Sequence, residues 1–354
     1  MATAERMTIS VLVPTYRRPD DLQRCLVAMA QQTRRADQIV VVARRDDEPT
    51  RQALARLRAS GHALDVVLVD KPGLVHALNS GLRAVACDLM AMTDDDAAPH
   101  RDWLERIEKT MGSGPRIAGA GGRDLIYGKE PPRGDRHSDV GRVQWFGRVV
   151  GNHHLGCGPP RRVDVLKGVN SAYRVEALKA IGFDERLKGA GAQFHFELVL
   201  GLSLIRNGWT LVYDPDILVD HYPAQRHDYN QRGMFNSLAV SNEVFNETLA
   251  LLEHLAPLRR AAFVAWSLLC GTRSYPGLFC ALVAAFERRR HVFARLRATL
   301  RGRSAAIAWW IRGRAAPAAD SARPATDGGA ASARGRDRNA EDVFAARPSV
   351  RETP

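Results

Sequence analysis

Cysteine is scarce in this chain, and its five cysteines are scattered over 354 residues. None belongs to a CxxC pair, so the sequence predicts neither a disulfide framework nor a cysteine-based zinc site. This usage favours a reducing compartment. The apolar run at residues 9–13 is also too short for the hydrophobic region of a signal peptide. We therefore expect a cytoplasmic protein.

Long apolar runs and glycine-rich phosphate motifs are missing as well. The apolar segments 261–270 and 278–286 are each about half of the roughly 20 residues that a bilayer-spanning helix needs, and a segment with glycine and proline separates them. The sequence contains no GxGxxG and no GxxxxGK[ST] motif, which argues against a classical dinucleotide site or a P-loop. Any phosphate must therefore be held in another way.

Positive charge is concentrated in one segment. The formal net charge is +12, and residues 255–314 contain twelve arginines and a single acidic residue. Arginines among apolar residues and tryptophans are typical of a segment that lies on an anionic membrane surface. A helical subdomain packed on the rest of the chain, with its arginines in solvent, is the alternative. No recognised nucleic-acid module accompanies the arginines, so we do not expect nucleic acid as a partner.

The sequence pattern divides the chain into three parts. Residues 1–230 alternate β-branched runs with helical patterns, and residues 231–314 form the basic helical segment. Residues 315–354 are rich in Ala, Arg, Pro and Gly without periodicity, so we expect a disordered tail.

The first part has the pattern of an α/β domain. Strands are expected at 9–14, 38–42, 65–69 and 88–93, with amphipathic helices between them. This alternation predicts right-handed βαβ units and a mainly parallel sheet flanked by helices. Ligands of such sheets bind beyond the carboxyl ends of the strands.

Three consecutive carboxylates, Asp94, Asp95 and Asp96, directly follow the fourth expected strand. Two carboxylates that flank one residue can offer hard oxygen ligands to Mg²⁺ or Mn²⁺. A solvated acidic loop is the alternative, but three adjacent carboxylates repel one another unless a cation compensates them. The triplet is therefore the first metal-site candidate.

A series of short motifs gives the chain a family resemblance. In order they are PTYRRP (14–19), GLVHALNSG (73–81), DDD (94–96), GVNSAYR (168–174), GFDE (182–185), FE (196–197), GW (208–209) and DP (214–215). Over residues 8–222 the chain resembles a family 2 glycosyltransferase of the GT-A fold. Each motif is weak alone, and their order carries the resemblance.

The resemblance implies a nucleotide-sugar donor and assigns residues to it. The implied donor-binding residues are Pro14, Thr15, Tyr16, Arg17, Asp46, Lys71, Asn79, Asp94 and Asp95. Thr15 and Tyr16 would contact the base. Either Asp46 or Asp47 would contact the base or ribose. Leu78 stands where the family usually has arginine, so a phosphate or base contact is either missing or supplied by Lys71.

The resemblance also implies the metal ligands and the catalytic base. Asp94 and Asp96 would bind Mn²⁺ or Mg²⁺, and His221 corresponds to a third ligand in some relatives. A histidine hydrogen-bonded at the end of a strand is the alternative for His221. Inversion at the anomeric carbon requires a general base, and the spacing to Gly208 gives that role to Glu197.

Together these features predict a metal-dependent inverting glycosyltransferase. Its acceptor would be a glycan or a lipid-linked hydroxyl in envelope polysaccharide or glycolipid synthesis, and it would work at the cytoplasmic face of the membrane. The alternative is a catalytically silent sugar-nucleotide or glycan-binding protein. Phe196 in place of the family's first acid and Leu78 in place of its usual arginine favour that alternative.

Overall fold

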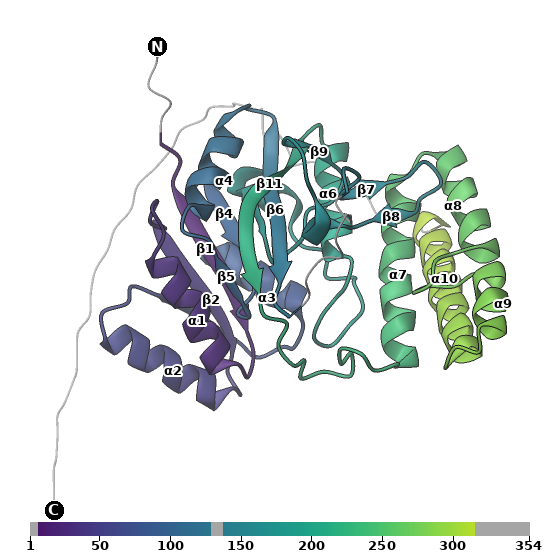
Figure 1. Ribbon diagram of the computed structural model, residues 1–354, viewed down its shortest axis with the longest axis horizontal. Coiled ribbons are helices and arrows are strands. Elements are labelled where there is room, and N and C mark those ends of the chain that lie inside the picture. The colour runs from purple at the N-terminus through teal and green to yellow at the C-terminus, as the bar shows by residue number, and fades with distance from the viewer. Residues whose placement is uncertain (1–5, 129–136, 316–354) are drawn as a thin grey trace, which may run out of the picture. The chain divides into compact units, whose positions relative to one another are not determined.

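The computed structural model of the protein describes residues 6–128 and 137–315 (Figure 1). In this part of the chain, nine strands form one sheet in the order β3-β2-β1-β4-β10-β6-β11-β5, and β9 pairs with β11. The strands are β1 (Ile9–Thr15), β2 (Gln38–Arg44), β3 (Asp65–Val69), β4 (Leu89–Met92), β5 (Ala97–Pro99), β6 (Ile117–Ile126), β9 (Arg161–Val163), β10 (Ser171–Arg174) and β11 (Thr210–His221). A separate hairpin consists of β7 (Arg142–Val143) and β8 (Val149–Val150).

The sheet is mixed: six of its nine strands run in the same direction, and four of its eight pairings are parallel. β1 pairs in parallel with β2 and β4, and β2 pairs in parallel with β3. β10 is antiparallel to both β4 and β6, so β6 and its parallel neighbour β11 run in the same direction as the first four strands. The carboxyl ends of these six strands therefore lie along one edge of the sheet.

Helices cover both faces of the sheet. One face packs against α1 (Pro19–Ala30), α2 (Glu48–Ala59) and α4 (Trp103–Gly112), and the other against α3 (Leu74–Ala84), α5 (Val175–Ile181) and α6 (Phe196–Arg206). On α1, Leu22, Cys25, Leu26 and Met29 are buried. Their spacing of three or four residues puts them on one side of the helix, so this side faces the sheet. Each of the leucine and methionine side chains contributes about 1.5–3 kcal/mol when it is fully removed from water.

The basic segment forms four helices that pack on this domain. They are α7 (Ser237–His254), α8 (Pro257–Leu269), α9 (Leu278–Phe286) and α10 (Val292–Ala315). Leu251 of α7 and Phe263 of α8 belong to the same hydrophobic core as α6. Between α7 and α10, the buried side chains of Glu247 and Arg303 form an ion pair of 3.2 Å. The segment is therefore anchored by apolar packing and by a buried charge pair.

Within residues 6–128 and 137–315, no helix is both long and apolar enough to cross a bilayer. The expected tail begins at residue 315, the last residue of α10, and from residue 316 onward it lies outside the described part of the chain.

Candidate active site

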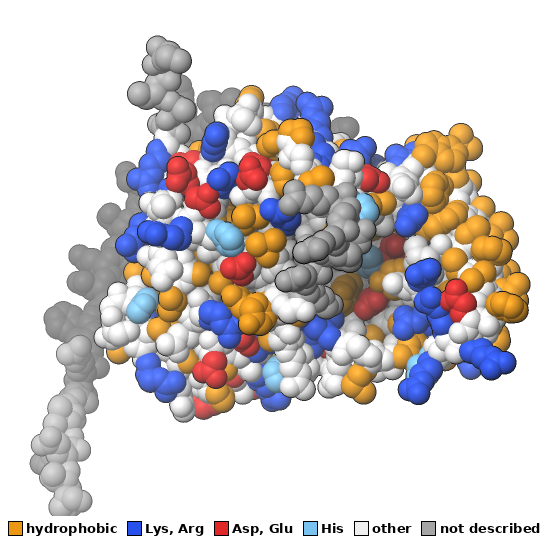
Figure 2. Space-filling model, in the orientation of Figure 1, with side chains coloured by type: hydrophobic (Ala, Val, Ile, Leu, Met, Phe, Trp, Pro, Cys, Tyr) orange, Lys and Arg blue, Asp and Glu red, His pale blue; other side chains and the backbone are white. Residues whose placement is uncertain are grey.

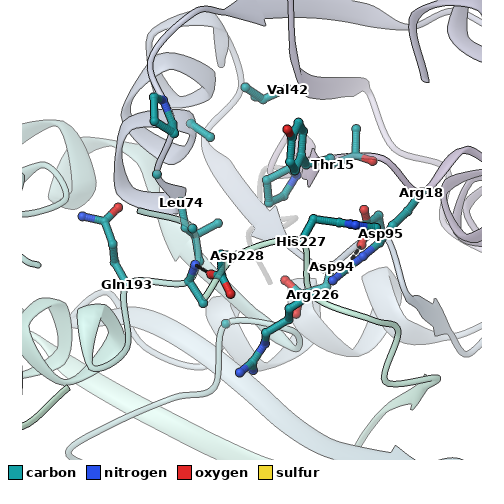
Figure 3. Close-up of a pocket in the computed structure, with 18 of the residues that line it drawn as sticks. Thr15, Arg18, Val42, Leu74, Asp94, Asp95, Gln193, Arg226, His227 and Asp228 are labelled. Atoms are coloured by element: carbon teal, nitrogen blue, oxygen red, sulfur yellow. Dashed lines mark hydrogen bonds and ion pairs between the residues drawn. The ribbon is translucent and has the colours of Figure 1, made fainter. Parts of the chain in front are cut away.

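A cleft of about 470 Å³ lies at the carboxyl edge of the sheet (Figure 3). Its walls come from the ends of β1, β2 and β4, from residues 71–74 at the start of α3, and from loop residues 190–194 and 226–232. Figure 3 shows Asp94, Asp95 and Arg18 on one side of the cleft and Gln193 on the other. This is the edge at which the sequence predicts ligand binding.

All three predicted metal ligands meet in this cleft. Asp94 and Asp96 follow β4, and His221 ends β11, whose last residue pairs with Ala97 of β5. One ligand atom from each of the three side chains lies within 4.8 Å of the other two. Among the described residues, these three side chains form the one group of acidic, histidine or cysteine side chains whose ligand atoms are close enough to share an ion.

The unpaired atoms of this group fit a cation. Asp96 Oδ1 and His221 Nε2 are buried without a hydrogen-bond partner, although they lie 3.4 Å apart. Burial and the charge of Asp96 raise the pKa of Asp94. Buried polar atoms without partners are costly, so a divalent ion bound by the three side chains would satisfy them. Two carboxylates with an imidazole suit Mn²⁺, and the carboxylates alone would suit Mg²⁺.

A second layer of contacts orients the imidazole of His221. Its Nδ1 lies 3.5 Å from Oδ2 of the buried Asp124 at the end of β6, and Asp124 also pairs with Lys167. Burial alone would lower the pKa of His221, but its interactions with Asp124 and Asp96 outweigh that effect and raise it to about 9. The position therefore favours positive charge, and a carboxylate behind a histidine is the usual arrangement around a bound metal.

Arginine side chains lie close to the carboxylates of Asp95 and Asp96 and compensate their charge. Arg18 lies 2.9 Å from Asp95 Oδ1 and 3.6 Å from Asp96 Oδ2, and Arg232 lies 3.5 Å from Asp96 Oδ2. The backbone N–H of Ala224 donates to the same Asp96 oxygen at 2.8 Å. Burial raises the pKa of Asp95 to about 7, although Arg18 opposes this shift. Asp95 lines the cleft, but its carboxylate already has a partner in Arg18.

The ring of Tyr16 forms another wall of the cleft. The guanidinium of Arg17 lies 5.0 Å from its centroid and that of Arg44 lies 5.4 Å away. The ring of His227 meets Tyr16 edge-on at 6.2 Å. Flat aromatic and guanidinium groups of this kind can stack on a nucleobase. Pro14, Thr15 and Lys71 line the same cleft.

Glu197 lies in the first turn of α6 and lines the cleft together with Gly168. The backbone N–H of Gly168 donates to Glu197 Oε1 at 3.3 Å. Burial, with a smaller contribution from the charge of Asp94, raises the pKa of Glu197 to about 7. A carboxylate with this pKa is suited to accept a proton near neutral pH. Phe196, which stands where the family has another acid, is buried against Phe183 with the ring centroids 6.1 Å apart.

A polar chain supports the start of α6. His195 precedes the helix with a φ of 68°, and its Nε2 lies 3.2 Å from the hydroxyl of Tyr275. That hydroxyl donates to Glu243 Oε2 at 2.9 Å, and Asn230 donates to the other oxygen of Glu243 at 2.6 Å. A positive φ is uncommon for a residue with a side chain, so these contacts hold the residue that leads into Glu197.

Three predicted donor-binding residues do not line the cleft. Asn79 forms two hydrogen bonds with the backbone of Phe183, at 2.8 and 2.9 Å, and thereby ties α3 to the loop after α5. Asp46 is exposed and pairs with Arg44 at 2.8 Å. Arg17 reaches the cleft only through its contact with the Tyr16 ring.

Several residues of the site were not predicted from the sequence. They are Arg18, Arg44, Gln193, Arg226, His227, Asp228 and Arg232, together with Asp124, which lies behind His221 and does not line the cleft. Arg18 belongs to the PTYRRP motif and could have been proposed from it. The others lie in segments without a recognisable motif and reach the site only through the fold.

Comparison with known proteins gives consistent matches. Residues 10–182 match the family described as Glycosyl transferase family 2. Glycosyltransferase AglE of Haloferax volcanii is 26% identical over 140 residues, which are 38% of this chain and 46% of AglE. Amylovoran biosynthesis glycosyltransferase AmsE of Erwinia amylovora is 34% identical over 129 residues, which are 34% of this chain and 48% of AmsE. The matched region thus spans about half the length of these curated relatives.

Solved structures share the fold at low sequence identity. The mannosyltransferase PcManGT from Pyrobaculum calidifontis, in complex with GDP-Man and Mn²⁺, has a TM-score of 0.51 and 18% identity over 88% of this chain and 80% of its own. Residues 1–349 of S. aureus TarS, in complex with UDP-GlcNAc, have a TM-score of 0.54 and 14% identity. The match covers 87% of this chain and 92% of the TarS chain. The match over residues 10–182 and the curated relatives support a family 2 glycosyltransferase, and the solved structures share its fold.

Proposed function

We propose that the protein transfers a sugar from a nucleoside diphosphate donor, with inversion, to a hydroxyl of a glycan or lipid-linked acceptor. The reaction would serve envelope polysaccharide or glycolipid synthesis. One observation carries the proposal: a single cleft joins the Asp94, Asp96 and His221 group, the ring of Tyr16 and the carboxylate of Glu197. The printed names of the matched relatives, which include an amylovoran biosynthesis glycosyltransferase, support this class of reaction.

The donor would bind with its base against Tyr16 and its diphosphate toward the carboxylates of Asp94 and Asp96. A bound Mn²⁺ or Mg²⁺ would supply Lewis-acid stabilisation of the negative charge that develops on the leaving diphosphate. Lys71 also lines the cleft and can contact a phosphate oxygen. Solved neighbours in complex with GDP-Man and with UDP-GlcNAc support a sugar linked through a diphosphate.

Glu197 would act as the general base. It would take the proton of the acceptor hydroxyl while that oxygen attacks the anomeric carbon from the side opposite the leaving diphosphate. The bond between the anomeric carbon and the diphosphate oxygen breaks as the new glycosidic bond forms, so the configuration inverts. The pKa of about 7 supports this role, because about half of the carboxyl groups are then ionised at pH 7 and the carboxylate is basic enough to accept a proton.

The protein would work at the cytoplasmic face of a membrane, with residues 255–314 as the contact. The arginines of this segment and its packing beside α6 support that location. A lipid-linked acceptor would then reach the enzyme from the bilayer.

The test is incubation of the full chain with UDP-, GDP- and dTDP-linked sugars, Mn²⁺ and a lipid extract as acceptor source. We expect release of nucleoside diphosphate, without pyrophosphate, and formation of a labelled glycolipid or glycan. NMR of that product should show the anomeric configuration opposite to that of the donor. Donor binding without any transfer would instead support a silent sugar-nucleotide-binding protein, and retained configuration would refute the single-displacement mechanism.

A further inference from the structure

Large apolar side chains are exposed along one side of the α8–α10 segment, at the right edge of Figure 2. Five of them form one face of α9, which we call the α9 face: Leu278, Phe279, Leu282, Val283 and Phe286. Phe286 is 91% exposed, and Phe293 nearby in α10 is 75% exposed. Ala281 is the one buried residue of α9. A contiguous apolar face of this kind marks a docking surface.

A second cavity lies directly beside the α9 face. Its volume is about 410 Å³, and it is formed by the loop before α9, by α9 itself, by the turn after α9 and by the start of α10. Phe279 and Val283 of the α9 face are among its lining residues. Four arginines also line it: Arg273, Arg289, Arg290 and Arg295. We call this space the arginine cavity.

The charge of the arginine cavity is only partly compensated. Glu287 pairs with Arg289 at 2.5 Å, and Arg295 donates to the backbone of Ser274 at 3.3 Å. Within the described residues, no ion pair or hydrogen bond engages the side chains of Arg273 and Arg290. The cavity therefore offers guanidinium groups to an anion next to an apolar surface.

Other parts of the basic segment serve the fold instead. Arg303 is buried with Glu247, and Arg259 donates to three backbone carbonyls of residues 143–145. Trp266 packs on Phe146 with the ring centroids 5.0 Å apart. The surface available to a partner thus centres on α9 and the arginine cavity rather than on the whole segment.

We propose that the α9 face lies in the interfacial layer of an anionic membrane, with the arginine cavity binding the phosphate group of a lipid. The combination fits an amphiphile, because apolar side chains can enter the acyl boundary while arginines meet the headgroups. A second copy of the chain is disfavoured as occupant, because two arginine cavities brought together would repel each other.

The docking surface is connected to the active site through a single loop. Arg273, Ser274 and Pro276 line the arginine cavity. Tyr275 between them contacts His195, the residue before α6. Membrane contact would thus occur beside the helix that carries Glu197, which suits an acceptor delivered from the bilayer.

Sedimentation of the full chain with vesicles tests the proposal without any transfer reaction. We expect binding to vesicles of phosphatidylcholine mixed with phosphatidylglycerol, weakened by added salt, and little binding to phosphatidylcholine alone. Arg273→Gln with Arg290→Gln should weaken binding about 25-fold, since each basic residue near an anionic surface contributes about fivefold. Phe279→Ser with Phe286→Ser should weaken it on the order of a hundredfold, because two exposed aromatic rings lose their apolar contact.

Matched controls separate this surface from general charge and hydrophobicity. Arg56→Gln with Arg58→Gln, at exposed positions of α2, and Val27→Ser on α1 should leave vesicle binding unchanged. Nucleotide binding measured by calorimetry should be the same in all variants, which shows that they fold. Equal binding to both kinds of vesicle, or α9 variants that bind like the wild type, would overturn the proposal. A dimer in light scattering that Phe286→Ser dissociates would also overturn it, because a second copy would then cover the face.

Discussion

Replacing Glu197 by glutamine removes a proton acceptor with little change in shape. The glutamine carbonyl can still accept the N–H of Gly168, which donates to Glu197 Oε1 at 3.3 Å in the wild type. Nucleotide affinity should therefore stay within roughly twofold, since the ground-state contacts persist. A positioned general base contributes about 10²–10⁴-fold to a rate, so we expect kcat to fall by that factor.

The pH profile gives this prediction a second readout. Burial raises the pKa of Glu197 to about 7, and the protonated form cannot accept a proton. The rate of the wild type should therefore rise about tenfold per pH unit below pH 7 and level off above it. The residual rate of Glu197→Gln should not show this rise with pH below 7.

The assay is release of nucleoside diphosphate, and Glu176→Gln is the matched control. Glu176 occupies the second position of α5, as Glu197 does in α6, but its side chain is exposed. The control should keep the activity and the pH profile of the wild type. Full activity in Glu197→Gln, or an acidic limb that survives in it, would refute the assignment of the base.

Three further predictions concern the rest of the site and its support. Tyr16→Ala should raise the Kd of the nucleotide by about 5–150-fold in calorimetry, because stacking of a base on an aromatic ring contributes about 1–3 kcal/mol; unchanged affinity would contradict the base pocket. Tyr275→Phe removes the hydroxyl next to His195, so kcat should fall severalfold at unchanged nucleotide Kd, and loss of affinity alone would contradict a positioning role. Arg303→Met leaves the buried Glu247 without its partner and should lower the free energy of unfolding by about 3–5 kcal/mol. Urea denaturation checks this value, and a loss below about 1 kcal/mol would mean that the pair is well solvated.

The first half of the fold was predictable because its signals are local. The expected strands at 9–14, 38–42, 65–69 and 88–93 correspond to β1–β4, and hydrophobic periodicity is enough to find them. β10 is short and lies antiparallel between β4 and β6. Such a pairing depends on partners distant in sequence, so periodicity alone did not indicate it.

The site was predictable where its residues form contiguous motifs. Asp94 and Asp96 were found as part of a triplet, and His221 through the resemblance to relatives in which a histidine is a third metal ligand. Asp124 and Arg232 were missed, because they meet His221 and Asp96 only across 97 and 136 residues of sequence. Asn79 shows that a motif can also mislead. It belongs to a family motif, but its side-chain amide hydrogen-bonds the backbone of Phe183 in a loop outside the cleft.

The sequence composition alone does not distinguish among the arginines of residues 255–314. The structure shows that some are buried in ion pairs and others are exposed. Arg303 is 2% exposed and paired with Glu247, whereas Arg290 is exposed in the arginine cavity. A count of charges cannot make this distinction, because it depends on which side of each helix faces the core.

Calorimetric titration with UDP, GDP, dTDP and CMP, with and without Mn²⁺, tests the central claim most directly, because it needs no acceptor. We predict that one nucleoside diphosphate binds, that Mn²⁺ strengthens its binding, and that Asp96→Ala abolishes this metal effect. Asp216→Ala, an exposed carboxylate in β11, should behave like the wild type. Absence of binding for all four nucleotides, or a metal effect that persists in Asp96→Ala, would contradict a metal-assisted nucleotide-sugar site in this cleft.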